Sequence, residues 1–507
     1  MLRRTLRALA LAALSALGTL AGPHTASAAP LPALSRDLSP FDTAGRWILD
    51  RQGRVVISHG LNSTNKFAPY LPMLRPEDAD TMATEGFTNV RLGFQWSALE
   101  PQPGQYDEQY IESLRQAVRM LHGRGIYTLL VNMVGNYSVD FAGHGAPPWA
   151  VFTDGIPNKS SNDYANALSN PALWRAYENF WKNRAAPDGT GIQDHYARAM
   201  AHLAARLRGE PGVLGLDLMN EPQWGDLTPF CMAFGFFGCA QADAPITTFN
   251  QRLEAAIHAA DPQRLVFFEP HYLSDGGFAS VAQLKAPRTV YSFHPYCPTM
   301  ILRQLSLPYV PPSRTLGGCS ALEDYIMNMQ VNKALRDGNA VMMNEFGATE
   351  DVTDIGHMVA VADKLMLPWT HWAWWAQDPA GQGDDGKRPW EGVIVDPTLP
   401  PVGDNLVQGK LDVLVRPHPL VVAGTPTAWR FDVPTRTFTL SYQTKRPAAA
   451  ADPSLVTEVF VPVRQYPHGY TASIQGGMQV SAANEPVLRI KATPGATAVL
   501  LKVMPRP

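Results

Sequence analysis

The chain has 507 residues, a net charge of −3 and 17% charged residues. This length is enough for more than one domain and for a large buried core. No excess of basic residues indicates a surface for nucleic acid, so we expect no nucleic-acid partner.

Residues 1–28 have the features of a secretory signal peptide. Basic residues in "MLRRTLR" precede an apolar stretch at 8–22, and small residues at 26–28 (ASA) form a cleavage site. A membrane anchor is the alternative, but the apolar stretch is short, and no later run is long and apolar enough to span a bilayer. The sequence therefore predicts a protein that is cleaved after Ala28 and secreted to the extracellular space.

From about residue 55, short apolar strands alternate with helical stretches such as 107–125 and 247–262. The predicted strands are 55–63, 88–96, 127–135, 213–222, 265–271, 289–296, 340–348 and 370–378. Near-continuous apolar strands between helices indicate a parallel sheet. Eight such units predict an α/β fold, a (β/α)8 TIM barrel over residues 29–400. An open doubly wound sheet is the alternative, but the glycine-rich phosphate turn expected after its first strand is missing.

Residues 401–507 have a different pattern of apolar, polar and turn residues. After a linker-like stretch rich in proline, short alternating runs such as "TFTLSYQT" and "TEVFVPV" are separated by turn residues. This pattern is typical of a C-terminal all-β sandwich domain. The tail contains no constellation of catalytic residues.

Polar residues stand at the ends of the predicted barrel strands, and two of them are Glu221 and Glu345. In a barrel these ends meet at one mouth. Cleavage of a glycosidic bond needs two carboxyl groups: one protonates the leaving oxygen, and the other attacks the anomeric carbon or activates a water. Asn220, beside Glu221, is suited to bond a sugar 2-hydroxyl. Either glutamate alone would be read as a solvated or salt-bridged carboxylate, but the pair predicts a glycosidase.

The motifs "NEP" after the fourth strand and "NEFG" after the seventh resemble those of retaining glycosidases of glycoside hydrolase family 5. The resemblance implies a (β/α)8 barrel with Glu221 as acid/base and Glu345 as nucleophile. It also implies a set of substrate-binding residues, among which Tyr296 bonds the nucleophile: Lys66, Arg91, Asn220, His294, Tyr296 and Trp375. No cofactor is expected, and no His/Cys cluster or CxxC motif predicts a metal.

Two tryptophans near Trp375 are expected to pack in the barrel, namely Trp372 and Trp374. The chain also departs from the family pattern at the third strand. Many relatives carry a histidine near its end, whereas this chain has Val134 and Asn136 in "LLVNMVGNYS". The shape of the site around the bound sugar is therefore not predicted by the resemblance.

Within that family the chain resembles the endoglycoceramidases, which cut the bond between sugar and ceramide in glycosphingolipids. Three stretches carry this likeness: "NEP" followed by an apolar loop and "GC", "APY" after the first strand, and the tail "VRPHPLVVAGTPTAWRFD". It implies a glycolipid or oligosaccharide substrate, contact with a membrane or micelle surface, and a monomer. The alternatives are a family 5 glycosidase acting on a glucan, a mannan or another simple glycolipid, and a non-catalytic carbohydrate-binding barrel.

The apolar loop is residues 229–241, "PFCMAFGFFGCAQ". Four cysteines allow three pairings, and sequence proximity favours Cys231 with Cys239 and Cys297 with Cys319. Apolar side chains of the loop are predicted to line a lipid groove or enter a membrane surface: Met232, Phe234, Phe236 and Phe237. The alternative is that they fold back as core. Residues 298–310 form a second apolar candidate.

Overall fold

The computed structural model describes residues 37–159, 163–299, 311–314, 319–376 and 391–506. The predicted signal peptide lies outside these residues, as does most of the second apolar candidate at 298–310. Within the described ranges, no helix combines the length and apolar character needed to cross a bilayer.

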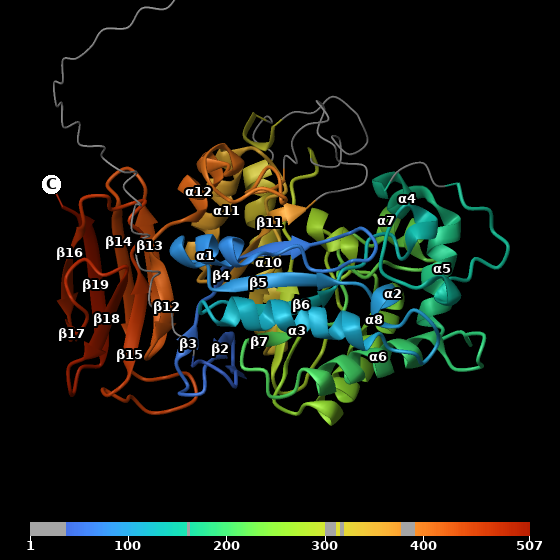
Figure 1. Cartoon of the computed structure of the whole chain (residues 1–507), viewed down its shortest axis with the longest axis horizontal. Coiled ribbons are helices and arrows are strands. Elements are labelled where there is room, and N and C mark those ends of the chain that lie inside the picture. Colours follow the sequence, from blue (N-terminus) through green and yellow to red (C-terminus); the bar gives the residue numbers. More distant parts are fainter. Residues whose placement is uncertain (1–36, 160–162, 300–310, 315–318, 377–390, 507) are drawn as a thin grey trace, which may run out of the picture. The chain divides into compact units, whose positions relative to one another are not determined.

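Eight parallel strands close into a barrel (Figure 1). In chain order they are β4 (His59–Thr64), β5 (Asn89–Phe94), β6 (Tyr127–Asn132), β7 (Val213–Asp217), β8 (Leu265–Phe268), β9 (Thr289–Phe293), β10 (Ala340–Met343) and β11 (Trp369–Ala376). All side chains of β4 to β10 are buried, which explains why the strands read as apolar runs without alternation. The predicted barrel is confirmed.

Helices follow most barrel strands, as the predicted alternation requires. The α-helices are α1 (Pro76–Thr84), α2 (Trp96–Leu99), α3 (Glu108–His122), α4 (Asp163–Ser169), α5 (Pro171–Trp181), α6 (Ile192–Arg206), α7 (Thr228–Phe234), α8 (Ala240–Ala260), α10 (Cys319–Asp337), α11 (Val352–Leu365) and α12 (Gln408–Leu414). Short 3-10 turns are η1 (Val139–Phe141), η2 (Pro148–Ala150), η3 (Tyr272–Gly276), η4 (Pro312–Arg314) and η5 (Gly403–Asn405).

Helix α3 shows how the sequence sets these boundaries. The carboxylate of Asp107 accepts hydrogen bonds from the backbone N–H groups of Gln109 and Tyr110, both at 2.9 Å, and so caps the first turn. Gly123 follows the last turn. The buried residues recur every three or four positions and form one apolar face toward the barrel: Tyr110, Ile111, Leu114, Ala117, Val118 and Leu121.

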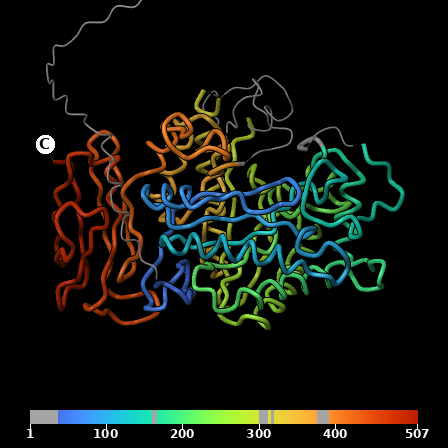
Figure 2. Tube along the Cα trace, in the orientation of Figure 1, coloured from blue at the N-terminus to red at the C-terminus, as the bar shows by residue number. Residues whose placement is uncertain are grey.

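The first predicted strand, 55–63, divides into two elements that belong to different sheets. Strand β4 enters the barrel, whereas β3 (Val55–Val56) pairs antiparallel with β12 (His418–Val422) from the C-terminal part of the chain. Together with β1 (Asp42–Ala44) and β2 (Trp47–Leu49), β3 extends a sheet that continues through β12, β15 (Val456–Phe460), β18 (Val487–Ala492) and β17 (Gly477–Gln479). Figure 2 shows this early blue segment beside the orange and red strands.

A second antiparallel sheet faces the first. It consists of β13 (Thr425–Asp432), β14 (Thr437–Gln443), β19 (Ala498–Pro505) and β16 (Tyr470–Gln475). One buried cluster contains side chains of both sheets, including Trp47 and Val422 from the first and Trp429 and Leu501 from the second. This is the predicted sandwich, completed by strands from the N-terminal side of the barrel.

Candidate active site

A cavity of about 310 Å³ opens at the carboxyl ends of the barrel strands. Its polar lining includes Lys66, Asn136, His144, Asn220, Glu221, Gln223, Asp275, Tyr296, Glu345 and Glu391. Its apolar lining includes Met133, Val134, Leu168, Leu273, Phe278, Pro298, Ala348 and Trp372. The two predicted carboxyl groups therefore share one cavity, although their residues are far apart in the chain.

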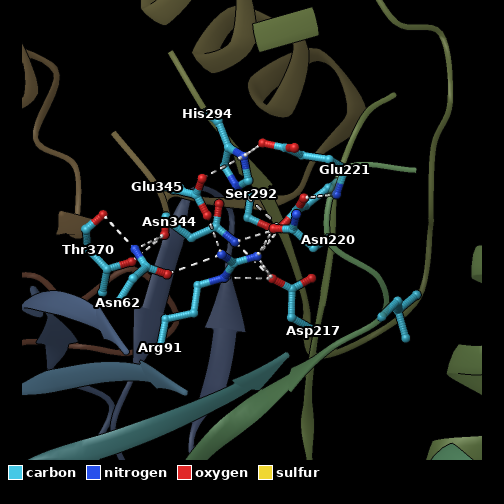
Figure 3. Close-up of polar contacts among 12 residues, drawn as sticks. Asn62, Arg91, Asp217, Asn220, Glu221, Ser292, His294, Asn344, Glu345 and Thr370 are labelled. Atoms are coloured by element: carbon cyan, nitrogen blue, oxygen red, sulfur yellow. Dashed lines mark hydrogen bonds and ion pairs between the residues drawn. The ribbon is translucent and has the colours of Figure 1, made fainter. Parts of the chain in front are cut away.

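A buried arginine lies beneath this cavity (Figure 3). Arg91 on β5 donates to Glu345 Oε2 at 2.8 Å, to Glu269 Oε1 at 2.7 Å and to Asn220 Oδ1 at 2.9 Å, and it also contacts Asp217 Oδ2 at 3.2 Å. Burial alone would lower the pKa of Arg91, but the charges of Glu269, Asp217 and Glu345 raise it above its usual value. The arginine therefore stays charged and fixes the carboxylates around it.

The two carboxyl groups at the cavity face each other at short range. Oxygen atoms of Glu221 and Glu345 and a ring nitrogen of His294 all lie within 4.8 Å of one another. His294 Nδ1 is 2.7 Å from Glu221 Oε1 and 3.9 Å from Glu345 Oε1, and the Tyr296 hydroxyl donates to Glu345 Oε1 at 2.7 Å. Both oxygens of Glu345 therefore have a donor, because Arg91 holds the other one.

The charges around His294 set the proton content of this group. Burial alone would lower the pKa of His294, but the carboxylates of Glu269 and Glu345 and the hydrogen bond to Glu221 raise it well above the usual value. Burial raises the pKa of Glu345; His294 and Arg91 lower it and Glu221 raises it, and the net direction is upward. A protonated imidazole offers no lone pair to a cation, so Glu221, His294 and Glu345 fit a proton network better than a metal site.

The backbone at Glu221 is held in a conformation that is rare for a residue with a side chain. Its φ is 44°, in the left-handed region. Its N–H donates to Glu269 Oε2 at 2.8 Å, and Asn220 beside it donates to the Val134 carbonyl at 3.1 Å. These bonds compensate the backbone strain and direct the Glu221 carboxyl into the cavity.

The predicted substrate-binding residues divide into two groups. Lys66, Asn220 and Tyr296 line the cavity. Arg91 and His294 do not: Arg91 is fully buried, His294 is 1% exposed, and both lie behind the carboxyl groups that they bind. Their assignment as substrate contacts is therefore corrected, because a ligand in the cavity meets the carboxylates first.

The predictions for Trp375 and Trp372 on β11 are wrong, whereas Trp374 is buried as expected. Trp375 is buried, pairs with Ser63 on β4 and is not in the cavity wall, whereas Trp372 lines the cavity. The register of β11 shifts between His371 and Trp375, so counting along an unbroken strand assigns the wrong side chain to the mouth. The Lys66 ammonium lies 5.0 Å from the centre of a Trp372 ring, and Trp372 Nε1 donates to Glu391 at 2.6 Å.

A histidine from another part of the chain lies beside the segment after β6, where the family histidine is missing. His144 lines the cavity, and its Nδ1 is 2.9 Å from the carbonyl of Met133. Gly135 and His144 form an antiparallel bridge. A Cβ on Gly143 would lie 1.8 Å from the Gly135 carbonyl oxygen, so the close approach needs glycine. His144 is not among the site residues predicted from the sequence. The spaced glycines of "VGNYSVDFAGHG" are the sequence signal for the close backbone approach that brings His144 to the cavity.

The apolar loop is closed by a disulfide between Cys231 and Cys239, and Cys297 is joined to Cys319, the pairs that proximity favours. Phe237 is 87% exposed and Phe234 is 77% exposed, so the loop is not folded back as core. None of the four predicted lipid contacts lines the cavity, which corrects that part of the prediction: Met232, Phe234, Phe236 and Phe237.

The loop nevertheless adjoins the cavity through one aromatic contact. The rings of Phe236 and Phe278 are 5.1 Å apart, and Phe278 is part of the cavity wall. The backbone N–H of Ala279 donates to the Phe236 carbonyl at 2.8 Å, which fastens the loop to the segment after β8. Phe230, Val281 and Leu227 are exposed as well. We call the exposed side chains of Leu227, Phe230, Phe234, Phe236, Phe237 and Val281 the phenylalanine patch.

Comparison with known proteins gives two family matches that together span most of the chain. Residues 49–378 match cellulase (glycosyl hydrolase family 5), and residues 416–503 match the glycoside hydrolase family 5 C-terminal domain. Endoglycoceramidase I of Rhodococcus hoagii (strain 103S) is 30% identical over 476 residues, which cover 92% of this chain and 88% of that protein.

Solved structures show the same fold. Endo-glycoceramidase II from Rhodococcus sp. in its ganglioside GM3 complex is 22% identical, with a TM-score of 0.71 over 90% of this chain and 99% of that chain. An endogalactoceramidase is 24% identical, with a TM-score of 0.71 over 92% of this chain and 99% of that chain. With the barrel, the C-terminal sheets and the paired carboxyl groups, these matches lead to one conclusion: the chain belongs to glycosyl hydrolase family 5 and is a glycoside hydrolase.

Proposed function

We propose that the protein is a retaining endo-β-glycosidase that cleaves the bond between sugar and ceramide in glycosphingolipids and releases glycan and ceramide. The observation that carries the proposal is a cavity that holds the paired carboxyl groups and whose wall includes apolar side chains after β8, Leu273 and Phe278. The names of the relatives, endoglycoceramidase and endogalactoceramidase, agree with it.

The short distance between the carboxyl groups supports retention of configuration. Retaining enzymes have carboxyl groups about 5–5.5 Å apart, whereas inverting enzymes leave about 6.5–9.5 Å for a water. Carboxyl oxygens of Glu221 and Glu345 lie within 4.8 Å of each other, which agrees with the spacing of retaining enzymes.

In the first step, the Glu345 carboxylate attacks the anomeric carbon while Glu221 gives its proton to the leaving oxygen, and ceramide departs. In the second step, Glu221 takes a proton from a water whose oxygen attacks the same carbon, and Glu345 is released. Arg91 and Tyr296 hold both oxygens of Glu345 in line for attack. Asn220, which lines the cavity beside Glu221, is the proposed partner of the sugar 2-hydroxyl.

The apolar wall stands on the leaving-group side. Tyr272, Leu273 and Phe278 follow β8, and the Tyr272 N–H donates to the carbonyl of Pro222, the residue after Glu221, at 3.0 Å. Lys66 and Trp372, which contact each other and also line the cavity, are the proposed contacts of the sugar. A polysaccharide would instead require sugar-binding groups on both sides of the carboxyl pair.

The phenylalanine patch continues this wall onto the surface through the contact of Phe236 with Phe278. We propose that the patch touches the membrane or micelle that holds the substrate, since an exposed apolar area of this kind marks a contact site. Secretion remains a prediction; two disulfides among the described residues fit an oxidising compartment. A monomeric state also remains a prediction.

Two comparisons test this function. The first is a substrate panel of a ganglioside, glucosylceramide, a galactosyl-series glycolipid and cellulose, with identification of the products. Release of intact glycan and ceramide supports the proposal. Cleavage of cellulose alone would favour the polysaccharide alternative, and tight binding of glycan without turnover would favour a non-catalytic barrel.

The second comparison uses the double variant Phe234→Ser, Phe237→Ser. Each ring buried against lipid contributes roughly 1.5–3 kcal/mol, so activity on a ceramide glycoside should fall by at least about tenfold. Activity on a soluble aryl glycoside of the same sugar should remain, because neither side chain lines the cavity. Leu500→Ser is the matched control, since Leu500 is 52% exposed on the distant strand β19. Equal losses on both substrates would mean that the loop is structural.

A further inference from the structure

A third carboxyl group stands beside the proposed acid/base. Asp275, in η3 after β8, is 7% exposed and lines the same cavity as Glu221. Its Oδ2 is 3.9 Å from His294 Nδ1, and the same nitrogen is 2.7 Å from Glu221 Oε1. Its carbonyl accepts from the Tyr296 N–H at 3.1 Å, which fixes the backbone against the turn that carries the other site residues.

Asp275 and Glu221 therefore bring two hydrogen-bond acceptors to one histidine nitrogen. Asp275 Oδ2 is buried and has no donor among the described residues. Two carboxylates at this distance repel each other, whereas a carboxyl group that keeps its proton donates to its neighbour. In agreement, burial and the charge of Glu221 raise the pKa of Asp275 well above its usual value.

The other charged and titratable groups that face Asp275 leave this proton in place. His294, the nearest cation, is closer to Glu221, at 2.7 Å, than to Asp275. Glu269 adds a negative charge and Tyr291 is a neutral phenol, held neutral by its burial. On α10, which packs against η3, Lys333 is paired with Asp337 at 2.7 Å.

We infer that Asp275 is a positioning residue for the acid/base: its carboxyl group holds one proton in a hydrogen bond to Glu221 and passes it to Glu221 when the leaving oxygen needs it. This role rests on the proposed function of Glu221. The proton moves from Asp275 to Glu221 and on to the leaving oxygen as the C–O bond breaks, and Asp275 is left ionised. In the second step, the proton taken from water returns to the pair.

The consequence is a shared titration. Because like charges resist joint ionisation, the last proton leaves a carboxyl pair at higher pH than it leaves a single glutamate. In Asp275→Asn, Glu221 loses its titrating neighbour and gains an amide donor that favours its ionised form. The variant should therefore lose the proton needed by the leaving oxygen at lower pH than the wild type does.

The test is the pH profile of kcat/KM for Asp275→Asn on a glycoside with a poor leaving group. The alkaline limb should move toward lower pH by about one unit or more. Partial unfolding would lower the rate at every pH without moving the limb, and Tm measured in parallel records it. Asp226→Asn is the control: it removes a carboxylate from the loop between β7 and α7, where Asp226 is exposed and pairs with Arg175 at 2.9 Å, and it should leave the limb unmoved. An unmoved limb in Asp275→Asn, or one moved to higher pH, would overturn the inference.

A second variant separates this inference from the proposed function. Glu221→Ala should lose activity on a poor leaving group and keep the first step on a dinitrophenyl glycoside, which needs no acid. If Glu221→Ala stays fully active on the poor leaving group, the acid/base assignment fails. If Glu221→Ala behaves as expected and Asp275→Asn does not shift the limb, only the role of Asp275 fails.

Discussion

Glu323→Gln should make the protein more stable at neutral pH, because Glu323 is a buried carboxyl group without a cation. It lies on α10, is fully buried, and neither of its oxygens has a donor among the described residues. Its neighbour is Asp354 on α11. Burial, together with the charge of Asp354, raises the pKa of Glu323 from 4.5 to about 10, and burial raises that of Asp354 to about 6.

The sign follows from proton linkage. A carboxyl group whose pKa is raised by folding binds more protons in the folded state, so its contribution is fully present below the unfolded pKa of 4.5 and is lost as the pH rises toward 10. At pH 7 the loss is at most about 3 kcal/mol, from about 1.4 kcal/mol per pH unit. Relaxation of the pair reduces this, and we expect a gain of roughly 1–3 kcal/mol in Glu323→Gln.

The assay is Tm of the wild type and of Glu323→Gln between pH 4 and pH 8. The variant should gain stability as the pH rises and should match the wild type near pH 4. Asp324→Asn is the matched control, because Asp324 is the next residue on α10 and its side chain is 50% exposed; its effect should stay within about 0.5 kcal/mol. A gain that is equal at pH 4 and pH 8, or a loss at pH 8, would refute the reasoning.

Two further predictions concern the site. Glu345→Gln should lower turnover by more than about 1000-fold, because the amide cannot form the glycosyl intermediate, while calorimetry should still detect substrate binding; near-normal turnover would remove the nucleophile role. Trp372→Ala should lower kcat/KM on a soluble aryl glycoside by roughly 10–100-fold through loss of an aromatic contact. Trp375→Phe, a change in the core, should lower Tm with little effect on KM; the opposite pattern would restore Trp375 as the sugar contact.

Much of the barrel is predictable from the sequence because its strands are buried on both faces and so read as unbroken apolar runs. Each of the eight predicted runs overlaps a barrel strand. The predicted strand at 55–63 shows the limit. No run of turn-forming residues between β3 and β4 marks the change of sheet, and the partner of β3 is more than 350 residues away in the sequence. The pattern of apolar residues within a short stretch of sequence cannot predict a strand pairing over that distance.

For the site, the sequence predicts which residues lie near one another but not how deeply each side chain is buried behind the cavity wall. Glu221 and Glu345 follow strands, so topology alone brings them together. Whether Arg91 or His294 touches ligand depends on the layers of side chains in the barrel, which no spacing encodes. Trp375 was misplaced because a shift of register inside β11 changes which side chains reach the mouth. The phenylalanines were predicted as apolar contacts, but only coordinates show that they face outward beside the cavity.

The pairing of β3 with β12 affects how the chain can fold. Residues near the start of the described chain and residues near its end share one sheet, so the hydrogen bonds between β3 and β12 form only after the whole barrel sequence between them has been made. Such distant pairings raise contact order and slow folding. A shortened chain that ends before β12 would leave the edge of β3 unpaired, and an unpaired edge strand promotes aggregation. The sheet that the first strands begin is therefore completed only after the last hundred residues have been synthesised.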